Sequence, residues 1–266
     1  MPAAALEVRD LCLRFGGLQA LGGVSFSAAP GELLALIGPN GAGKTTVFNC
    51  VNGLYRPDAG SISLDGVDLV GRKPHRIARA GVARTFQNIE LFSHMTTLDN
   101  LMLGRHVHLR TGFLGGLFFG PRVVAEEMAH RRRVEEILDL LDLQAARDQL
   151  VSGLPYGIQK MVELGRALAL EPRLLLLDEP CAGMNAEETL DLALRIADIR
   201  AEHEVTILLV EHDMRLVMDI SDRVLAMAGG RVITCGPPAE VREHPEVLRA
   251  IIGQSDLCGA SSVEEG

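Results

Sequence analysis

The segment GPNGAGKTT, at residues 38–46, constrains the fold of this chain more than any other feature of the sequence. It matches the pattern GxxxxGK[ST] completely, with Gly38, Gly43, Lys44 and Thr45 at the defining positions. It stands between an almost continuous apolar run, typical of a buried strand, and a helical pattern, which disfavours a chance match of a glycine-rich turn. Such a loop turns backbone N–H groups and a helix N-terminus toward a phosphate, which Lys44 also reaches, while Thr45 can bind Mg2+. The phosphate-binding residues predicted here are Gly38, Pro39, Asn40, Gly41, Ala42, Gly43, Lys44, Thr45 and Thr46.

A second motif, RLLLLDEP at residues 173–180, combines a buried apolar run with two carboxylates. At the end of a strand beside a phosphate loop, one aspartate can hold the Mg2+ shell and a second acid can deprotonate an attacking water. We therefore assign Asp178 to Mg2+ and Glu179 to the water. Two acids can also cap a helix, but the phosphate loop in the same chain favours the chemical interpretation. Together the two motifs predict an enzyme that hydrolyses a nucleoside triphosphate.

The charge balance of the chain argues against nucleic acid as a partner. The 266 residues carry a net charge of -9 and the pI is about 5.4, which argues against a broad basic surface for nucleic acid. The basic run at residues 130–133 is flanked by acids at helical spacing and predicts a solvated helix face. Five scattered cysteines without metal-binding spacing indicate a reducing compartment. We expect no signal peptide, and no apolar run approaches the roughly 20 residues of a membrane helix.

The order of the patterns along the chain predicts an α/β fold. After two strand patterns near the N-terminus, SISLDGVDL at residues 61–69 predicts a hairpin that turns at Asp65 and Gly66. Residues 97–170 lack strand patterns and predict an inserted helical subdomain. From Arg173 onward strands alternate with a helix, which is typical of a mostly parallel sheet covered on both faces.

Residues 154–160, LPYGIQK, resemble the LSGGQ signature of ATP-binding cassette (ABC) proteins in a variant form. The motifs above follow the family's order, and the resemblance covers nearly the whole chain. It implies a P-loop NTPase of ABC type, with a RecA-like mostly parallel sheet, an antiparallel β subdomain and the helical subdomain. In the family two cassettes pair head to tail, and each signature helix points its N-terminus at the γ-phosphate held by the other. A helix N-terminus suits that task because it carries partial positive charge and unpaired N–H donors.

Four positions of this variant signature differ in what they can contribute. Gly157 matches the signature glycine, whose missing side chain lets backbone approach a phosphate, and Tyr156 precedes it. Pro155 and Ile158 stand where the family has serine and glutamine, although proline suits an early helical position. We therefore expect a phosphate-sensing helix mouth at Tyr156 and Gly157 that relies on backbone N–H groups. In a pair of unlike cassettes, the site completed by this signature would be the weaker one.

Three further assignments rest on the resemblance. Gln87, in RTFQNIELF, aligns with the Q-loop glutamine, which reaches the Mg2+ and water site. His212, in LLVEHDM, aligns with the switch histidine that contacts the γ-phosphate, and Phe15 replaces the aromatic residue that stacks on adenine. The histidines that fit no motif, and are expected at the surface, are His94, His106, His108 and His203.

Several segments resemble the cassettes of branched-chain and hydrophobic amino-acid importers in particular. They are the YG of the signature, the AGxN form of the loop after Glu179, and residues 211–253. The long segment between Gln87 and the signature, which includes TGFLGGLFFGPR, resembles the larger, LivG-type cassette. The resemblance implies an ATP-hydrolysing importer subunit for such amino acids or related small solutes, with ATP and Mg2+ as cofactors. We expect one ABC domain over residues 1–253 and a flexible polar tail over residues 254–266.

The same resemblance implies a set of partners. ATP would close a dimer with a second ABC subunit, either an identical chain or a LivF-type cassette. Two membrane-spanning permease subunits and, indirectly, a periplasmic or extracellular solute-binding protein would complete an importer. The chain would then lie on the cytoplasmic face of the cell membrane as a peripheral subunit.

Two other functions remain open at this point. A soluble ABC ATPase that moves no solute would act on ribosomes, DNA or cluster assembly, but such proteins usually carry two cassettes, long coiled insertions or basic patches. A P-loop kinase would need an acceptor pocket and basic lid residues, which the sequence does not reveal. The joint presence of Gln87, the signature variant and His212 also speaks against a kinase.

Overall fold

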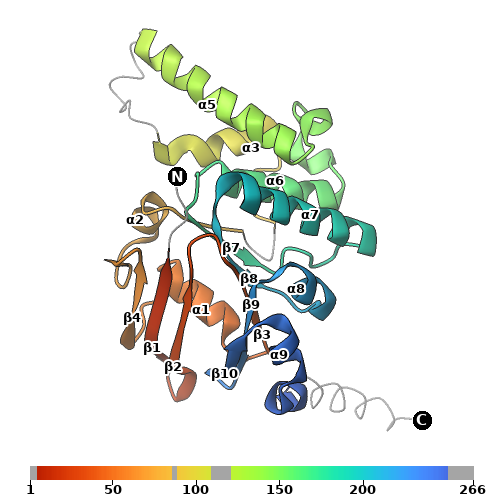
Figure 1. The fold of residues 1–266 in the computed structure, drawn as a ribbon. Helices are drawn as coiled ribbons and strands as arrows, with labels where there is room; N and C mark the ends of the chain where they lie inside the picture. Colours follow the sequence, from red (N-terminus) through yellow and green to blue (C-terminus); the bar gives the residue numbers. More distant parts are fainter. Residues whose placement is uncertain (1–4, 86–88, 109–120, 251–266) are drawn as a thin grey trace, which may run out of the picture.

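The computed structural model describes residues 5–85, 89–108 and 121–250, and its centre is a six-stranded sheet (Figure 1). Neighbouring strands are parallel except at one edge, where β10 runs antiparallel to β9. In spatial order the strands are β10 (Arg231–Gly236), β9 (Arg223–Ala228), β3 (Leu33–Ile37), β8 (Thr206–Val210), β7 (Leu174–Asp178) and β6 (Val82–Arg84). The mostly parallel sheet expected from the sequence is confirmed.

A second, four-stranded sheet is entirely antiparallel. In spatial order it contains β2 (Leu18–Ala28), β1 (Leu6–Phe15), β4 (Ala59–Leu64) and β5 (Val67–Asp68). The last two strands form the predicted hairpin, in which Asp65 and Gly66 have φ angles of 48° and 75°. Positive φ at both central residues is the requirement of the tight turn that matches strand twist, so the Asp-Gly pair explains the hairpin.

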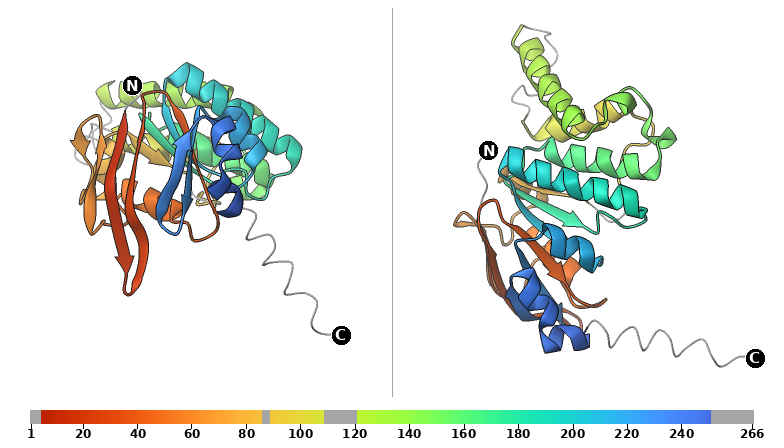
Figure 2. Two further views of the ribbon diagram at one scale, coloured as in Figure 1. Left: turned by 60° about the horizontal axis from the view of Figure 1, so that its bottom comes forward. Right: turned by 45° about the vertical axis from the view of Figure 1, so that its right-hand side comes forward.

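The helices cover the large sheet and extend the molecule beyond it. The α-helices are α1 (Lys44–Val51), α2 (Pro74–Arg79), α3 (Thr97–Gly104), α5 (Pro121–Leu140), α6 (Tyr156–Leu168), α7 (Ala186–His203), α8 (Met214–Ile220) and α9 (Pro238–Glu243). Short 3-10 helices are η1 (Arg105–His108), η2 (Gln144–Ala146) and η3 (Val151–Gly153). All of the described elements between β6 and β7 are helices. This helical region lies at the end of the molecule opposite to the antiparallel sheet (Figures 1 and 2). The division into one domain and an inserted subdomain stays a prediction.

Alternate side chains of the central strands enter two different cores. On β3, Leu33, Ala35 and Ile37 pack with α3, α5, α6 and α7, whereas Leu34 and Leu36 pack with α1 and the antiparallel sheet. Because both faces are covered, these strands read as continuous apolar runs instead of alternating ones. Helix α1 is buried through Val47, Phe48, Cys50 and Val51, which fixes the loop that precedes it.

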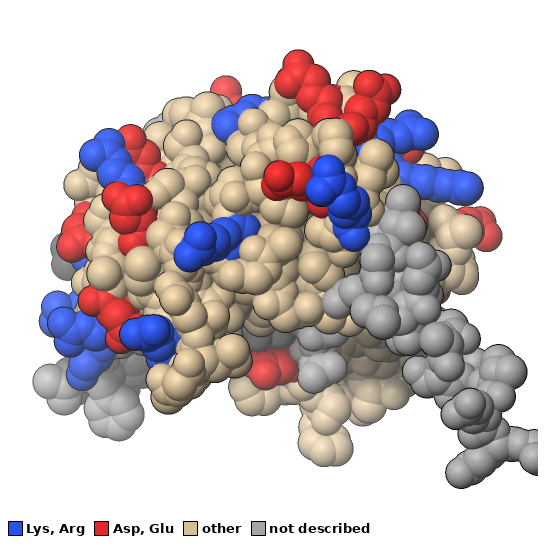
Figure 3. All heavy atoms as spheres, turned by 90° about the horizontal axis from the view of Figure 1, so that it is seen from below, with Lys and Arg blue, Asp and Glu red and all other residues tan. Residues whose placement is uncertain are grey.

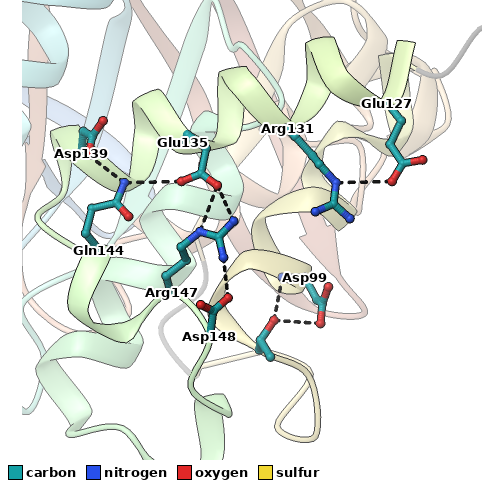
Figure 4. Close-up of polar contacts among 9 residues, drawn as sticks. Asp99, Glu127, Arg131, Glu135, Asp139, Gln144, Arg147 and Asp148 are labelled. Carbon is teal, nitrogen blue, oxygen red and sulfur yellow. Dashed lines mark hydrogen bonds and ion pairs between the residues drawn. The ribbon is translucent and has the colours of Figure 1, made fainter. Parts of the chain in front are cut away.

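Polar contacts hold the loop after α5 against that helix (Figure 4). Arg147 donates from Nε and Nη2 to Glu135 Oε1 on α5 at 2.9 and 2.6 Å. Gln144 Nε2 donates to Asp139 Oδ1 at 2.7 Å, one turn further along α5. These bonds fix the direction in which the chain returns toward α6.

Some expectations for basic and histidine residues are wrong. His130, in the run expected to be a solvated face, is 7% exposed and accepts a hydrogen bond from Arg105 Nε at 3.2 Å. His108 and His203 are half-buried, and His108 Nε2 lies 2.9 Å from Leu170 O. His94 and His106 are exposed, as expected. The sequence does not reveal the burial of His130 and His108 because it depends on how η1 packs between α5 and the end of α6.

Two observations concern the surface of the described residues. None of the helices within the described ranges is long and apolar enough to cross a membrane. On the face drawn in Figure 3, Lys and Arg side chains are interspersed with Asp and Glu and do not gather into one large basic area.

Candidate nucleotide-binding and hydrolysis site

The loop at residues 38–43 joins β3 to α1 in a conformation that only glycine tolerates. Gly38 has φ 147°, and a Cβ added to it would lie 2.1 Å from Met227 O. Gly43 has φ 100°, and a Cβ there would lie 2.9 Å from Leu21 Cδ2 and 3.0 Å from Ala20 O. Gly43 is also the N-cap of α1 and provides no side-chain cap, so the first N–H groups of the helix remain available to an anion.

Lys44 begins α1, and its ammonium group folds back over the loop. Nζ donates to Gly38 O at 2.6 Å and to Pro39 O at 3.1 Å, and the residue is 6% exposed. Burial lowers the pKa of Lys44, while the nearby charges of Glu179 and Asp178 raise it. A phosphate that enters the loop offers this cation a charged partner in place of neutral carbonyls.

Asp178 is the last residue of β7 and is paired with an arginine from the neighbouring strand. Arg84 Nη2 donates to Asp178 Oδ2 at 2.6 Å, and the two side chains are 6% and 5% exposed. Arg84 Nη1 donates to Asn49 Oδ1 on α1 at 2.6 Å, and its guanidinium carbon lies 5.8 Å from the ring centre of Phe48. The arginine therefore links β6, β7 and the helix that follows the phosphate loop.

Glu179 and His212 form a pair at the ends of adjacent strands. His212 Nε2 lies 2.7 Å from Glu179 Oε1, and because a carboxylate only accepts hydrogen bonds, this contact places a proton on Nε2. The side chains are 18% and 45% exposed, so the pair is open to solvent. Glu179 has φ 47°, a left-handed conformation that costs a non-glycine residue energy.

One cavity of about 460 Å³ brings most of the predicted residues together. Its lining includes Phe15, residues 40–46, Glu179 and His212. Phe15 is 45% exposed and packs edge to face on Tyr55, with ring centres 5.2 Å apart. A larger groove of about 970 Å³ runs between α7 and α8, but its lining contains none of the predicted site residues. We place the site in the smaller cavity because the phosphate loop and the acid-histidine pair meet there.

Several predicted residues are not part of this lining, among them Gly38 and Pro39 at the start of the phosphate loop. Tyr156 and Gly157 form the first turn of α6 and are not part of its lining. Gln87 lies outside the described residues, so its position is not tested. Asp178 lies directly beside Glu179 but is 3% exposed and likewise does not line the cavity.

The N-terminal end of α6 packs against the loop that follows Glu179. Pro155 is the N-cap of α6, not a residue within it, and no side-chain hydrogen bond caps the helix. Tyr156 Oη donates to Ala182 O at 3.1 Å. A Cβ at Gly157 would lie 2.7 Å from Glu188 Oε1, so a larger residue there would have to displace the Glu188 side chain. Glu188 is held by a capping box in which Asn185 accepts hydrogen bonds from two amides at the start of α7.

Sequence reasoning missed three residues around this site. Arg84 and Asn49 support Asp178, and Glu211 accepts hydrogen bonds from the loops that carry Glu179 and His212. A usable signal was present, since Arg84 and Glu211 are charged residues at the ends of buried strands. Their partners are distant in sequence, so the signal did not indicate what they bind.

Comparisons with known proteins agree with this arrangement. A family model described as ABC transporter matches residues 21–182. The ATP-binding protein BraF of Pseudomonas aeruginosa, named for high-affinity branched-chain amino acid transport, is 44% identical over 255 residues, 96% of this chain and 100% of that protein. LivG of Escherichia coli K12, with the same transport named, is 42% identical over the same shares of both chains.

Solved structures give the same result at the level of the fold. The ADP conformation of an ATP-binding cassette of an ABC transporter has a TM-score of 0.82 and 30% identity, over 94% of this chain and 99% of that one. A nucleotide-free ATP-binding cassette from an ABC transporter has a TM-score of 0.80 and 29% identity, over 93% and 98% of the two chains. Fold and phosphate loop thus define a P-loop nucleoside triphosphatase. More particularly, the chain belongs to the ABC transporter family, whose ATP-binding cassettes are ATPases.

The pair of Arg84 and Asp178 generates a prediction for the nucleotide-free protein. Changing Arg84→Met should lower the free energy of unfolding by about 3 to 5 kcal/mol, because it leaves a buried carboxylate without its cation. The double change Arg84→Met with Asp178→Leu should recover most of that loss, since both charges of the pair are then removed. Urea denaturation followed by circular dichroism measures both.

The matched control is Arg9→Met, which breaks an ion pair with Glu7 whose side chains are 68% and 48% exposed. It should change stability by less than about 1 kcal/mol. Equal losses from Arg9→Met and Arg84→Met, or no recovery in the double variant, would contradict the role we give to Arg84.

Proposed function

We propose that this chain is the ATP-hydrolysing subunit of an ABC importer for branched-chain or other hydrophobic amino acids, or for related small solutes. The hydrolytic part rests on one observation, the 2.7 Å contact between His212 Nε2 and Glu179 Oε1 beside the phosphate loop. The importer part is supported by the likeness to BraF and LivG over nearly the full length of all three chains.

ATP would enter the cavity with its phosphates on the loop at residues 38–46. The uncapped first turn of α1 and the loop N–H groups bind phosphate oxygens, and the ammonium of Lys44 leaves Gly38 O and Pro39 O to reach the terminal phosphates. Phe15, which also lines the cavity, offers an exposed ring on which adenine can stack.

The proposal includes a magnesium ion that is shared with the substrate and lies between Thr45 and Asp178, whose pairing with Arg84 keeps it a carboxylate. Among the described residues no group of three or more His, Cys, Asp or Glu side chains could hold a metal by itself. Mg2+ usually takes one or two protein oxygens together with phosphate oxygens, and the Asp178 carboxylate and Thr45 hydroxyl are suitable ligands. The ion would neutralise charge that develops on the phosphates. Gln87 stays a predicted third ligand.

Hydrolysis needs a base and a group that holds it in place, and the pair of Glu179 and His212 supplies both. Glu179 accepts the proton of the attacking water, since it is the carboxylate that faces the cavity. The Nε2–H of His212 fixes the carboxylate, and the same N–H can turn to a γ-phosphate oxygen when ATP is bound.

The first turn of α6 would complete the ATP site of a second cassette. Its N–H groups at Tyr156 and Gly157 lie outside this chain's own cavity and receive no side-chain cap. ATP favours the closed pair only through contacts that it makes with both chains, so closure is a ligand-driven shift of population. The second cassette would be an identical chain or a LivF-type one.

We further propose that the chain uses Mg2+ as a cofactor. It would bind two permease subunits on the cytoplasmic face of the membrane. A solute-binding protein would contact the permease and not this chain. ATP-driven closure and hydrolysis-driven reopening would then be coupled to transport through the permease, and solute specificity would lie in those other subunits.

The hydrolytic proposal predicts that Glu179→Gln lowers kcat by a factor of about 100 or more, because the base that takes the proton of water is lost. The Kd for ATP should change little, since glutamine has the same shape and the phosphate loop is intact. Steady-state phosphate release and displacement of a fluorescent nucleotide measure the two quantities.

Glu187→Gln is the control, because this exposed glutamate lies in the first turn of α7, does not line the cavity and should behave as the wild type. Sustained hydrolysis by Glu179→Gln, at a rate near that of the control, would show that another group acts as the base.

The transport proposal is separated from the soluble alternative by what the chain binds in cells. The affinity-tagged Glu179→Gln variant should copurify from detergent-solubilised membranes with multi-spanning permease subunits, identified by mass spectrometry. Recovery with ribosomes or nucleic acid and without permease subunits would favour the soluble ABC ATPase.

A further inference from the structure

A buried carboxylate, Glu211, lies between the two loops that carry the acid-histidine pair. It directly follows β8 and is 5% exposed. Its Oε1 accepts the N–H of Cys181 at 2.9 Å, and its Oε2 accepts the N–H of His212 at 2.9 Å. Each carboxylate oxygen is therefore bound to the backbone of a different loop.

The two backbone positions that Glu211 holds are close in sequence to the proposed catalytic groups. Cys181 is the second residue after Glu179, and His212 is itself one member of the pair. The parallel register of β7 and β8 matches Asp178 with Val210, and the Glu179 N–H donates to Val210 O at 2.8 Å. Glu211 extends this connection between the strands by two residues beyond the point where the sheet ends.

The backbone at Glu179 needs such support. Its φ of 47° is left-handed, and a non-glycine residue keeps this conformation only where the surrounding structure holds it. The hydrogen bond from the Glu179 N–H to β8 holds one side of the turn. The hydrogen bond from the Cys181 N–H to Glu211 holds the other side. Without the second bond, the turn could relax and move the Glu179 carboxylate away from His212.

The chemistry of the surroundings makes the amide of Cys181, not its thiol, the functional group. Burial raises the pKa of the Cys181 thiol far above its usual range, and the charge of Glu211 raises it further. The thiol therefore stays protonated and is a poor nucleophile. Lys160, which is 4% exposed and pairs with Glu163, lowers the pKa of the same thiol, but burial and Glu211 outweigh it.

We propose that Glu211 is a positioning residue that sets the separation of Glu179 and His212 by binding one N–H from each loop. This inference rests on the site assigned under the proposed function. A carboxylate suits the task because it offers two acceptors and no donor, whereas glutamine would turn an NH2 group toward one of the two N–H groups.

The test compares the wild type with Glu211→Gln in steady-state ATP hydrolysis by the full chain in its cassette pair. We expect kcat to fall about 10- to 100-fold, because small misplacements of reacting groups are costly. KM and the Kd for a fluorescent ATP analogue should stay within about twofold, since the phosphate loop is not touched. Glu211→Asp keeps two acceptors on a side chain one methylene shorter and should retain more activity than Glu211→Gln.

Glu32→Gln is the matched control for a merely structural effect. Glu32 is 8% exposed and accepts a backbone N–H from Ala29 at 2.6 Å and a side-chain N–H from Arg223 at 3.1 Å. It precedes β3 and therefore lies at the amino end of that strand, opposite to the carboxyl ends that carry the site. Glu32→Gln should lower the melting temperature to a similar extent and leave kcat of the folded protein unchanged.

A second readout does not depend on activity. Amide hydrogen exchange at Cys181 and His212 should become faster in Glu211→Gln and remain unchanged in Glu32→Gln. Unchanged exchange at both amides, or a fall in kcat that matches the control, would overturn the positioning role even if one variant proves unstable.

Glu179→Gln, measured alongside, separates this inference from its basis. If Glu179→Gln is inactive and Glu211→Gln is fully active, the role of Glu211 alone is wrong. If Glu179→Gln still hydrolyses ATP, the proposed site is wrong and the positioning role is overturned with it.

Discussion

The site depends on the parallel pairing of β3, β7 and β8, because parallel strands bring their carboxyl ends to one edge of a sheet. The register matches Leu36 with Val210 and Val210 with Asp178, so the chain leaves all three strands at the same level. The phosphate loop, the acidic pair and the residues Glu211 and His212 follow directly from those ends. Because neighbouring strands lie about 4.8 Å apart, residues that follow the carboxyl ends of these three parallel strands lie within reach of one substrate.

The two cores keep that edge rigid while leaving it open to solvent. Alternate residues of each central strand pack into opposite cores, so a slip by one residue would move every side chain into the other core and disrupt the packing of both. At the edge itself, buried charged groups are bound to specific partners: Arg84 to Asp178, and Glu211 to two backbone amides. Such contacts stabilise little in net terms, but they allow few arrangements of the loops they join. The strands are rigid and the loops that follow them are held in one conformation. Together these two features place Glu179 and His212 in their 2.7 Å contact.

Much of this arrangement could be predicted from the sequence, for a physical reason that differs from element to element. The phosphate loop and the Asp-Gly hairpin are contiguous and impose their own backbone geometry, so their residues identify them. The sheet could be predicted because strands buried on both faces read as unbroken apolar runs. The partner of Arg84 is 94 residues away and the partner of Glu211 is 30 residues away, so no local pattern reveals those bonds. His130 was misjudged for the same reason, since its burial depends on Arg105 from a separate helix.

The central claim is that this chain binds ATP at one edge of its sheet and offers the mouth of α6 to a second cassette. Its most direct test is the mass in solution, by light scattering, of the Glu179→Gln variant with and without MgATP, alone and mixed with the second cassette of its importer. The account predicts that MgATP doubles the mass in at least one of the two cases and that MgADP does not. A mass that stays that of single chains in both cases, while ATP is bound, would contradict the claim.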